Sequence, residues 1–103
     1  MAGRTDSCWA ILGSELRTAR SRGDSAFVLD LLTLRGRGRA RIGLIKEAEP
    51  DLRASMALAE ALGQPRTLRA NLRWLSYTFG RQGRNAEALA GWSRLLALSQ
   101  ASG

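Results

Sequence analysis

Histidine is absent from the 103 residues of this chain, and cysteine occurs only once, at Cys8. Without histidine the chain can form neither a Ser/His nor a Cys/His nucleophile pair, and it has no imidazole ligand for a metal. A single cysteine forms no disulfide within the chain and gives no ligand spacing. We therefore expect no enzyme activity, no cofactor and no metal site.

Long apolar runs are missing as well, and proline occurs only twice. Near the N-terminus the longest apolar run is Cys8–Leu12, which is too short for the hydrophobic part of a signal peptide. No run approaches the ~18 residues that cross a bilayer. These absences favour a cytoplasmic protein without membrane contact. The abundance of Leu, Ala, Arg and Glu indicates one small all-α domain.

Lysine is nearly absent too, because arginine supplies all but one, Lys46, of the 16 basic residues. The formal net charge is +7. Such an excess can mark a nucleic-acid or acidic-protein partner. The alternative is that arginine is used wherever a solvated helix face needs a charge, and we favour this alternative for the excess as a whole.

Two amphipathic segments separated by Gly83 make up the C-terminal part of the chain. Their apolar residues recur with a helical period: Leu68, Leu72, Leu75 and Phe79, then Ala88, Trp92, Leu95, Leu96 and Leu98. Gly83 is expected to end the first helix, and Asn85 to cap the second. The pattern predicts a hairpin of helices at 66–82 and 85–101.

The pattern recurs 40 residues earlier. A shift of that size aligns Leu32 with Leu72, Gly43 with Gly83, Ala48 with Ala88 and Gly63 with Gly103. Gly36 and Gly38 disfavour helix by ~1 kcal/mol each, but the repeat aligns 35–42 with 75–82, so we predict helix there. The same shift aligns Leu12, Leu16 and Ala19 with Leu52, Met56 and Ala59, so the first helix corresponds to the second half of a repeat.

These alignments divide the chain into a frayed start (1–6), a half repeat (7–23) and two repeats (24–63 and 64–103). The first helix is expected from Ser7, and Asp24 or Ser25 is expected to cap the second. The third is expected from Lys46 to Leu62, with Pro50 in or near its first turn. Glu47, Glu49 and Asp51 near its start are interpreted as complementing the helix dipole rather than as an acid/base site. Cys8 is interpreted as a small apolar filler beside Trp9.

Eight residues match the consensus positions of a tetratricopeptide repeat: Leu72, Leu75, Ser76, Phe79, Gly83, Ala88, Trp92 and Leu95. Ala88 and Ser76 would be the small residues where the helices approach, and Trp92 and Phe79 would fill the wedge between them. The chain thus resembles a tetratricopeptide repeat protein, although Gln100 stands where a proline is usual. Its period is longer than the standard 34 residues. The long period and the AEALGQP ending resemble the MalT-like arrays of bacterial LuxR-type and antibiotic-regulator transcriptional regulators, over about residues 14–103.

The resemblance implies a right-handed superhelix of about two and a half helix hairpins. It also implies a protein–protein interaction scaffold in a regulatory segment of such a regulator. The groove of such a repeat would be lined by Asp30, Thr33, Arg37 and Arg41, then by Ala70, Arg73, Tyr77 and Arg81. We expect Arg37, Arg41, Arg73, Tyr77 and Arg81 to form a groove for an acidic protein or peptide segment. A specific carboxylate clamp is not expected, because the asparagine that accompanies the basic residue in clamping relatives is missing.

Two further expectations concern partners. The alternative function is a nucleic-acid-binding helical module that uses the arginine surface, and its binding would weaken steeply with salt. Self-association is the other expectation, because both ends of the array carry apolar residues and neither has an evident polar cap. These residues are Trp9, Ile11, Leu12 and Leu16 at one end and Trp92, Leu95, Leu96 and Leu98 at the other.

Overall fold

The computed structural model describes the backbone of residues 2–101 and the side chains of residues 7–101. Within these limits the chain forms five helices: α1 (Ala2–Ser21), α2 (Ser25–Arg41), α3 (Ile45–Ala61), α4 (Pro65–Arg81) and α5 (Asn85–Ala101). The predicted all-α fold of one unpaired helix followed by two hairpins is confirmed. None of these helices is long and apolar enough to cross a lipid bilayer.

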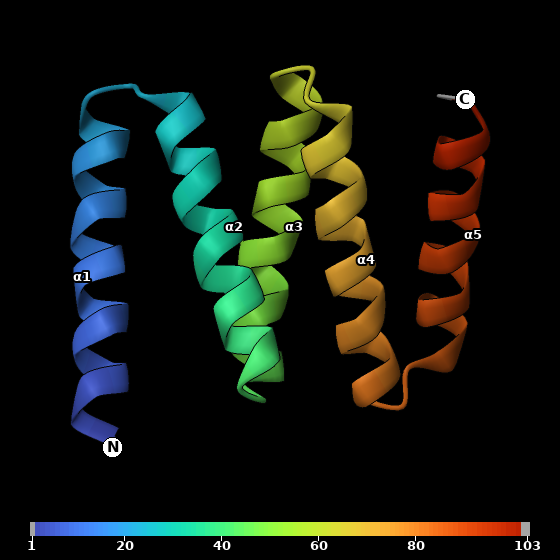
Figure 1. The fold of residues 1–103 in the computed structure, drawn as a ribbon, viewed down its shortest axis with the longest axis horizontal. Coiled ribbons are helices and arrows are strands. Elements are labelled where there is room, and N and C mark those ends of the chain that lie inside the picture. The colour runs from blue at the N-terminus through green and yellow to red at the C-terminus, as the bar shows by residue number, and fades with distance from the viewer. Residues whose placement is uncertain (1, 102–103) are drawn as a thin grey trace.

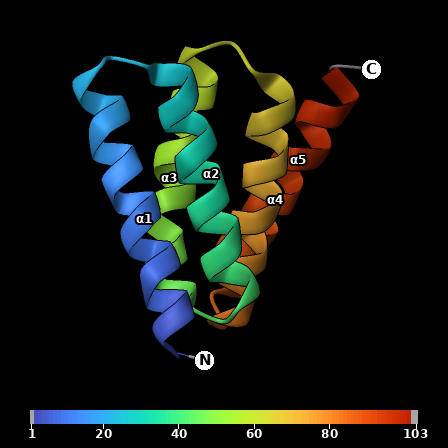
Figure 2. The same cartoon turned by 60° about the vertical axis from the view of Figure 1, so that its left-hand side comes forward.

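The helices run alternately up and down, and each packs against its neighbours in the chain (Figure 1). In addition, α2 contacts α4 directly. The molecule therefore has two layers, with α2 and α4 on one side and α1, α3 and α5 on the other (Figure 2). Within the described residues the backbone of α5 packs against α4 alone, and one ion pair, Arg94–Glu60 at 3.7 Å, joins α5 to α3, so α5 forms one end of the array.

The four turns share one geometry. Their glycines, Gly23, Gly43, Gly63 and Gly83, have φ angles between 66° and 92°, a region that other L-residues rarely adopt. In the last turn the Arg84 amide donates to the Phe79 carbonyl at 2.9 Å, which satisfies an orphan carbonyl of α4. Because the turns are alike and α2–α5 are equally long, these helices begin at regular intervals: Ser25, Ile45, Pro65 and Asn85.

The glycine-rich part of α2 is helical because of its tertiary packing. Gly36 is buried, and a Cβ atom added to it would lie 2.9 Å from Leu52 Cδ2 and 3.2 Å from Asp51 Cβ of α3. The absence of a side chain at Gly36 therefore lets α2 and α3 approach closely, which offsets the poor helix propensity of glycine. The helix predicted over 35–42 is confirmed as far as Arg41, with Ile42 as its C-cap.

Two buried clusters form the core. The larger cluster extends from α2 to α5 and contains Leu29, Ala40, Ala48, Leu52, Met56, Ala59, Leu68, Leu72, Leu75, Phe79, Ala88 and Leu95. The smaller cluster joins α1 to α2 and contains Leu16, Ala19, Val28, Leu31 and Leu32. Every helix thus contributes buried apolar residues to at least one cluster, and the partly buried Leu58 packs against both clusters.

Two helix starts differ from the predictions. The first helix begins at Ala2, several residues before Ser7. Asn85 is the first residue of α5 and not its cap, because the Ala88 amide already donates to the Arg84 carbonyl at 3.0 Å.

Two further local predictions have different outcomes. Pro50 lies in the second turn of α3, where its missing N–H removes one backbone hydrogen bond of the helix. The prediction for α2 is confirmed, since the Asp24 carboxylate caps this helix by accepting a hydrogen bond from the Phe27 amide at 3.2 Å.

Candidate partner-binding surface

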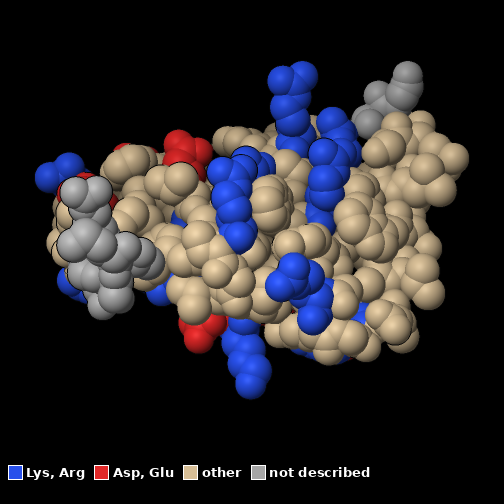
Figure 3. Space-filling view, turned by 60° about the horizontal axis from the view of Figure 1, so that its bottom comes forward, with Lys and Arg blue, Asp and Glu red and all other residues tan. Residues whose placement is uncertain are grey.

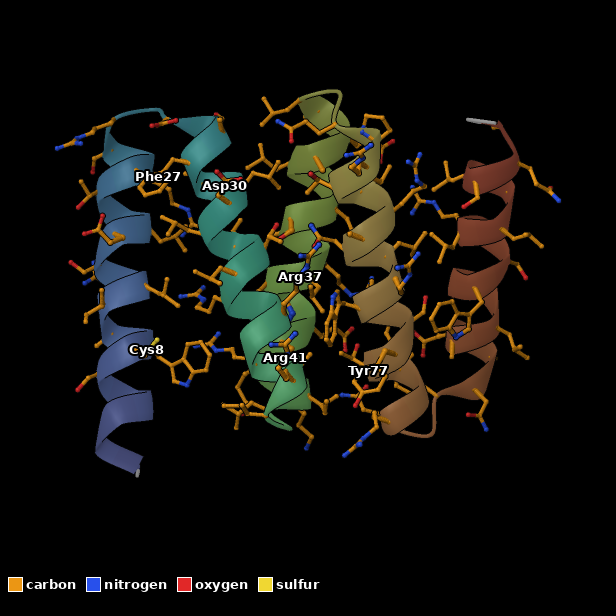
Figure 4. The ribbon with its side chains drawn as sticks, in the orientation of Figure 1. Cys8, Phe27, Asp30, Arg37, Arg41 and Tyr77 are labelled. Carbon is orange, nitrogen blue, oxygen red and sulfur yellow. The ribbon has the colours of Figure 1, made fainter. Side chains whose placement is uncertain are left out.

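Two hollows open among the side chains of α2 and α4, and the first of them extends to α5. The first, which we call the aromatic hollow, has a volume of about 440 Å³ and is lined by Arg41, Arg73, Trp74, Tyr77 and Trp92. The second, which we call the α2 hollow, measures about 360 Å³ and is lined by Asp30, Thr33, Leu34, Arg37 and Thr67. Figure 4 shows Asp30, Arg37 and Arg41 along α2, and Tyr77 on the neighbouring α4.

Four of the five residues of the predicted groove line these hollows. Arg41, Arg73 and Tyr77 line the aromatic hollow, whereas Arg37 lines the α2 hollow. Arg81 lies beside Tyr77, and its Nη1 donates to the Tyr77 hydroxyl oxygen at 3.5 Å. The structure therefore brings Arg41, Arg73 and Tyr77 into one hollow and places Arg81 against Tyr77.

Aromatic rings hold two of these arginines. The guanidinium carbon of Arg41 lies 6.0 Å from the Trp74 ring centroid, and that of Arg81 lies 5.9 Å from the Tyr77 ring centroid. The rings of Trp74 and Tyr77 pack edge to face, with their centroids 5.8 Å apart. A guanidinium stacked on a ring keeps its in-plane N–H donors for a carboxylate or a phosphate. The hollow thus combines apolar surface with oriented donors.

Trp92 is the lining residue that the sequence pattern placed wrongly. It was predicted to fill the wedge between α4 and α5, yet it is 42 % exposed. The closest approach between these helices lies at Gly91 and Ser76, since a Cβ atom on Gly91 would overlap the Ser76 hydroxyl oxygen. Ser76 is fully buried there, as predicted for a small residue of this crossing. Ala88 is buried beside this crossing, as predicted. The sequence feature that could have identified Gly91 as a point of close approach is its lack of a side chain at a position about one helical turn after Ala88.

Arg35 and Arg39 have a structural role that the sequence did not indicate. Asp51, only 5 % exposed, accepts two hydrogen bonds from Arg35, at 2.9 and 2.8 Å, and one from Arg39, at 3.0 Å. These bonds join α2 to α3. The interpretation of Asp51 as a helix-dipole residue is therefore wrong, because Asp51 lies beyond the first turn of α3 and its carboxylate pairs with two arginines of α2.

Glu49 also links helices. It accepts hydrogen bonds from Arg53 at 2.9 Å and from Arg84, the residue just before α5, at 2.6 Å. Burial acts to raise the pKa of Glu49, but these hydrogen bonds and the positive charges outweigh it, so the pKa lies below its ordinary value. Arg84 also pairs with Glu87 at 2.6 Å. Of the three acidic residues near the start of α3, only Glu47 lies in the first turn, as the dipole interpretation requires.

The groove arginines differ from these structural ones. Within residues 7–101, Arg37, Arg41, Arg73 and Arg81 form no ion pair with a carboxylate. The Nε atom of Arg37 is buried and has no hydrogen-bond partner in that part of the chain. Figure 3 shows basic side chains gathered over the middle of one face, beside an end near the C-terminus that is uncharged in this view. This face therefore has donors for an acidic ligand.

The ends of the array match the predicted apolar surfaces only in part. Leu16 and Leu95 are buried, whereas Ile11 on α1 and Leu96 on α5 are 62 % and 61 % exposed. The prediction for Cys8 is wrong, since its side chain is exposed. Its neighbour Trp9 packs against α2 instead, 5.5 Å from the Arg39 guanidinium carbon.

Comparison of the chain with the models of known families, with curated proteins and with solved structures finds no match.

Proposed function

We propose that this chain is a protein-interaction module whose α2/α4 side binds an acidic segment of a partner protein. The observation that carries the proposal is the aromatic hollow, in which Arg41 and Arg73 lie beside three aromatic side chains without a carboxylate of their own. Arginine binds carboxylates through paired hydrogen bonds, and exposed tryptophan and tyrosine are frequent anchors at protein interfaces. An acidic segment with apolar side chains would use both features.

The resemblance to tetratricopeptide arrays supports a more specific proposal. In that family the helices equivalent to α2 and α4 line the groove that binds a partner. We propose that the chain is a regulatory or sensor segment of a bacterial transcriptional regulator. The regular helix starts at Ser25, Ile45, Pro65 and Asn85 agree with a two-helix repeat of this period.

Binding to a nucleic acid is the second candidate. Arginines without an ion pair and exposed aromatic rings also suit single-stranded nucleic acid, where bases stack on aromatic side chains. We place it second because Arg35, Arg39, Arg53 and Arg84 are engaged in ion pairs within the chain. This leaves fewer guanidinium groups for phosphates than the net charge suggests.

A binding titration separates the candidates. The ligands are a Glu-rich peptide with leucine, a matched peptide with Gln in place of Glu, and a single-stranded oligonucleotide, each at ~50 and ~200 mM salt. We expect the parent to prefer the Glu peptide and the double variant Arg41→Glu, Arg73→Glu to lose that preference. The control, Arg17→Glu with Arg22→Glu, makes the same charge change at exposed positions at and beyond the end of α1 and should keep it.

Equal binding of the Glu and Gln peptides by the parent would overturn the proposal. Oligonucleotide binding tighter than peptide binding, with a steep salt dependence, would establish the second candidate instead.

A further inference from the structure

Helix α3 is the second helix of a repeat, and it has a neighbouring helix packed against each of two sides. It lies between α2 and α4, and two parallel rows of its residues are buried. One row is Ala48, Asp51 and Ser55, and the other is Leu52, Met56 and Ala59. Asp51 bonds to α2, which identifies the first row as the row that faces the preceding helix.

Helix α5 has the same two rows, but only one of them is covered. The first row, at Ala88, Gly91 and Leu95, is buried against α4. In the second row, Trp92 and Leu96 stand where α3 has Leu52 and Met56, and they are 42 % and 61 % exposed. Leu89, one turn before Trp92, is 67 % exposed. We call Leu89, Trp92 and Leu96 the open face of α5.

The chain itself shows which element fits such a face. On α3 the equivalent residues Leu52 and Met56 belong to one buried cluster with Leu68, Leu72 and Leu75 of α4, and Leu52 also packs against Gly36 of α2. The covering element is therefore an amphipathic helix with leucine at intervals of four and three residues. A helix with the same spacing could lie along α5 as α4 lies along α3.

A polar contact of α4 specifies the charge of this helix. Asn71, which is fully buried, donates from Nδ2 to Thr33 Oγ1 of α2 at 3.1 Å. The residue of α4 that corresponds to Thr33 is Arg73, which lines the aromatic hollow. A helix docked on α5 would therefore place its equivalent of Asn71 opposite Arg73. Because a guanidinium only donates hydrogen bonds, a carboxylate is the matching group there.

We propose that the open face of α5 binds an amphipathic, acidic helix of a partner protein. In this helix an acidic residue lies three residues after the first leucine. The second leucine follows the acidic residue directly, and the third leucine lies three residues after the second. Its acidic side chain pairs with Arg73. The inference rests on the proposed function, because Arg73 and Trp92 belong both to the aromatic hollow and to this docking site.

A second copy of the chain fits this site less well. Among the described helices α2 and α4 have the required type, and each is already covered by three neighbours. Pairing two α5 helices would also bring like-charged molecules together, since the formal net charge is +7. An acidic partner helix complements this charge.

The probe is a synthetic peptide of 17 residues, the length of α4, which keeps the four apolar residues Leu68, Leu72, Leu75 and Phe79 in register. Glu replaces Asn71, and Glu or Ala replaces each arginine. We expect binding by calorimetry, with a gain in helical circular dichroism. Leu96→Ser should weaken binding about tenfold or more, because it removes a side chain that becomes buried. The control Ile11→Ser changes an equally exposed residue at the other end and should leave the affinity unchanged.

A charge exchange tests the register. Arg73→Glu should weaken binding of the Glu peptide about tenfold. A peptide with Lys in place of that Glu should bind this variant more tightly than it binds the parent. If the exchange restores no affinity, the proposed pairing is wrong.

Two further outcomes distinguish this inference from the proposed function. A peptide of the same composition with a central proline cannot form the helix. If it binds equally well and Leu96→Ser has no effect, the preference for acidic ligands stands but the helix-docking inference fails. If the chain does not bind the peptide and instead forms dimers that Leu96→Ser dissociates, a second copy covers the open face of α5 and the inference is overturned.

Discussion

Replacing Gly91 with alanine tests the closest approach between α4 and α5. Alanine favours helix by about 1 kcal/mol over glycine when nothing else changes. At Gly91, however, the new Cβ atom would lie 3.1 Å from Ser76 Cβ and overlap the hydroxyl oxygen. Overpacking of this kind costs about 1–3 kcal/mol. We therefore expect the overpacking to cancel or exceed the helix gain, with a net loss of up to about 2 kcal/mol.

Gly13 in α1 provides the matched control. The nearest atom to a Cβ atom added there is Arg17 Nη1, a flexible side-chain end at 3.7 Å. Gly13→Ala should therefore show the helix gain alone, about 0.5–1 kcal/mol.

Urea unfolding followed by helical circular dichroism measures both variants against the parent. For a chain of this size a difference of 1 kcal/mol also shifts the melting temperature by roughly 4–8 °C. The expected order of stability is Gly13→Ala, then the parent, then Gly91→Ala. If Gly91→Ala were as stable as Gly13→Ala, the helices would not meet at this point and the packing described for α5 would be incorrect.

Three other substitutions test the interhelical contacts by the same unfolding measurement. Asp51→Ala leaves Arg35 and Arg39 without their shared carboxylate. The free energy of unfolding should fall by roughly 2–3 kcal/mol, less than for a fully buried pair because the arginines are partly exposed. An unchanged unfolding midpoint would show that the ion pairs contribute nothing. Glu49→Gln should reduce the acid sensitivity of unfolding: the pKa of Glu49 is lowered in the folded state, so its stabilisation is complete above the ordinary pKa and is lost as the pH falls through the folded value. A parallel pH dependence in parent and variant would contradict this. Ala88→Leu should overpack the crossing and cost about 1–3 kcal/mol, whereas Ala90→Leu, on the exposed side of α5, should not.

Helix number and position could be predicted because their signals are local. Apolar spacing defines each amphipathic helix, and Gly23, Gly43, Gly63 and Gly83 mark turns that only glycine readily forms. The helix through Gly36 needed the internal repeat as well, because its stability comes from packing against Leu52 rather than from propensity.

The partners of charged residues could not be predicted in the same way. Arg35 and Arg37 are two residues apart on one helix, yet only Arg35 reaches Asp51. Which of them does so depends on the rotation of α2 against α3, which the sequence pattern does not define closely enough. The exposure of Trp92 has a similar origin, since its row is buried only where another helix follows, as on α3.

The equivalence of α1 and α3 has a consequence for how such a chain can change its length. Leu16 and Ala19 of α1 are buried against α2, as the corresponding Met56 and Ala59 of α3 are buried beside α4. If residues 25–64 were deleted, Gly23 and Asp24 would lead directly into α4, and α1 would present its own apolar row to that helix. Loss of two helices preserves the alternation of direction, whereas loss of one would reverse every later helix. Recombination within the gene could therefore lengthen or shorten the protein by a pair of helices, because the helices that become neighbours already carry matching apolar rows.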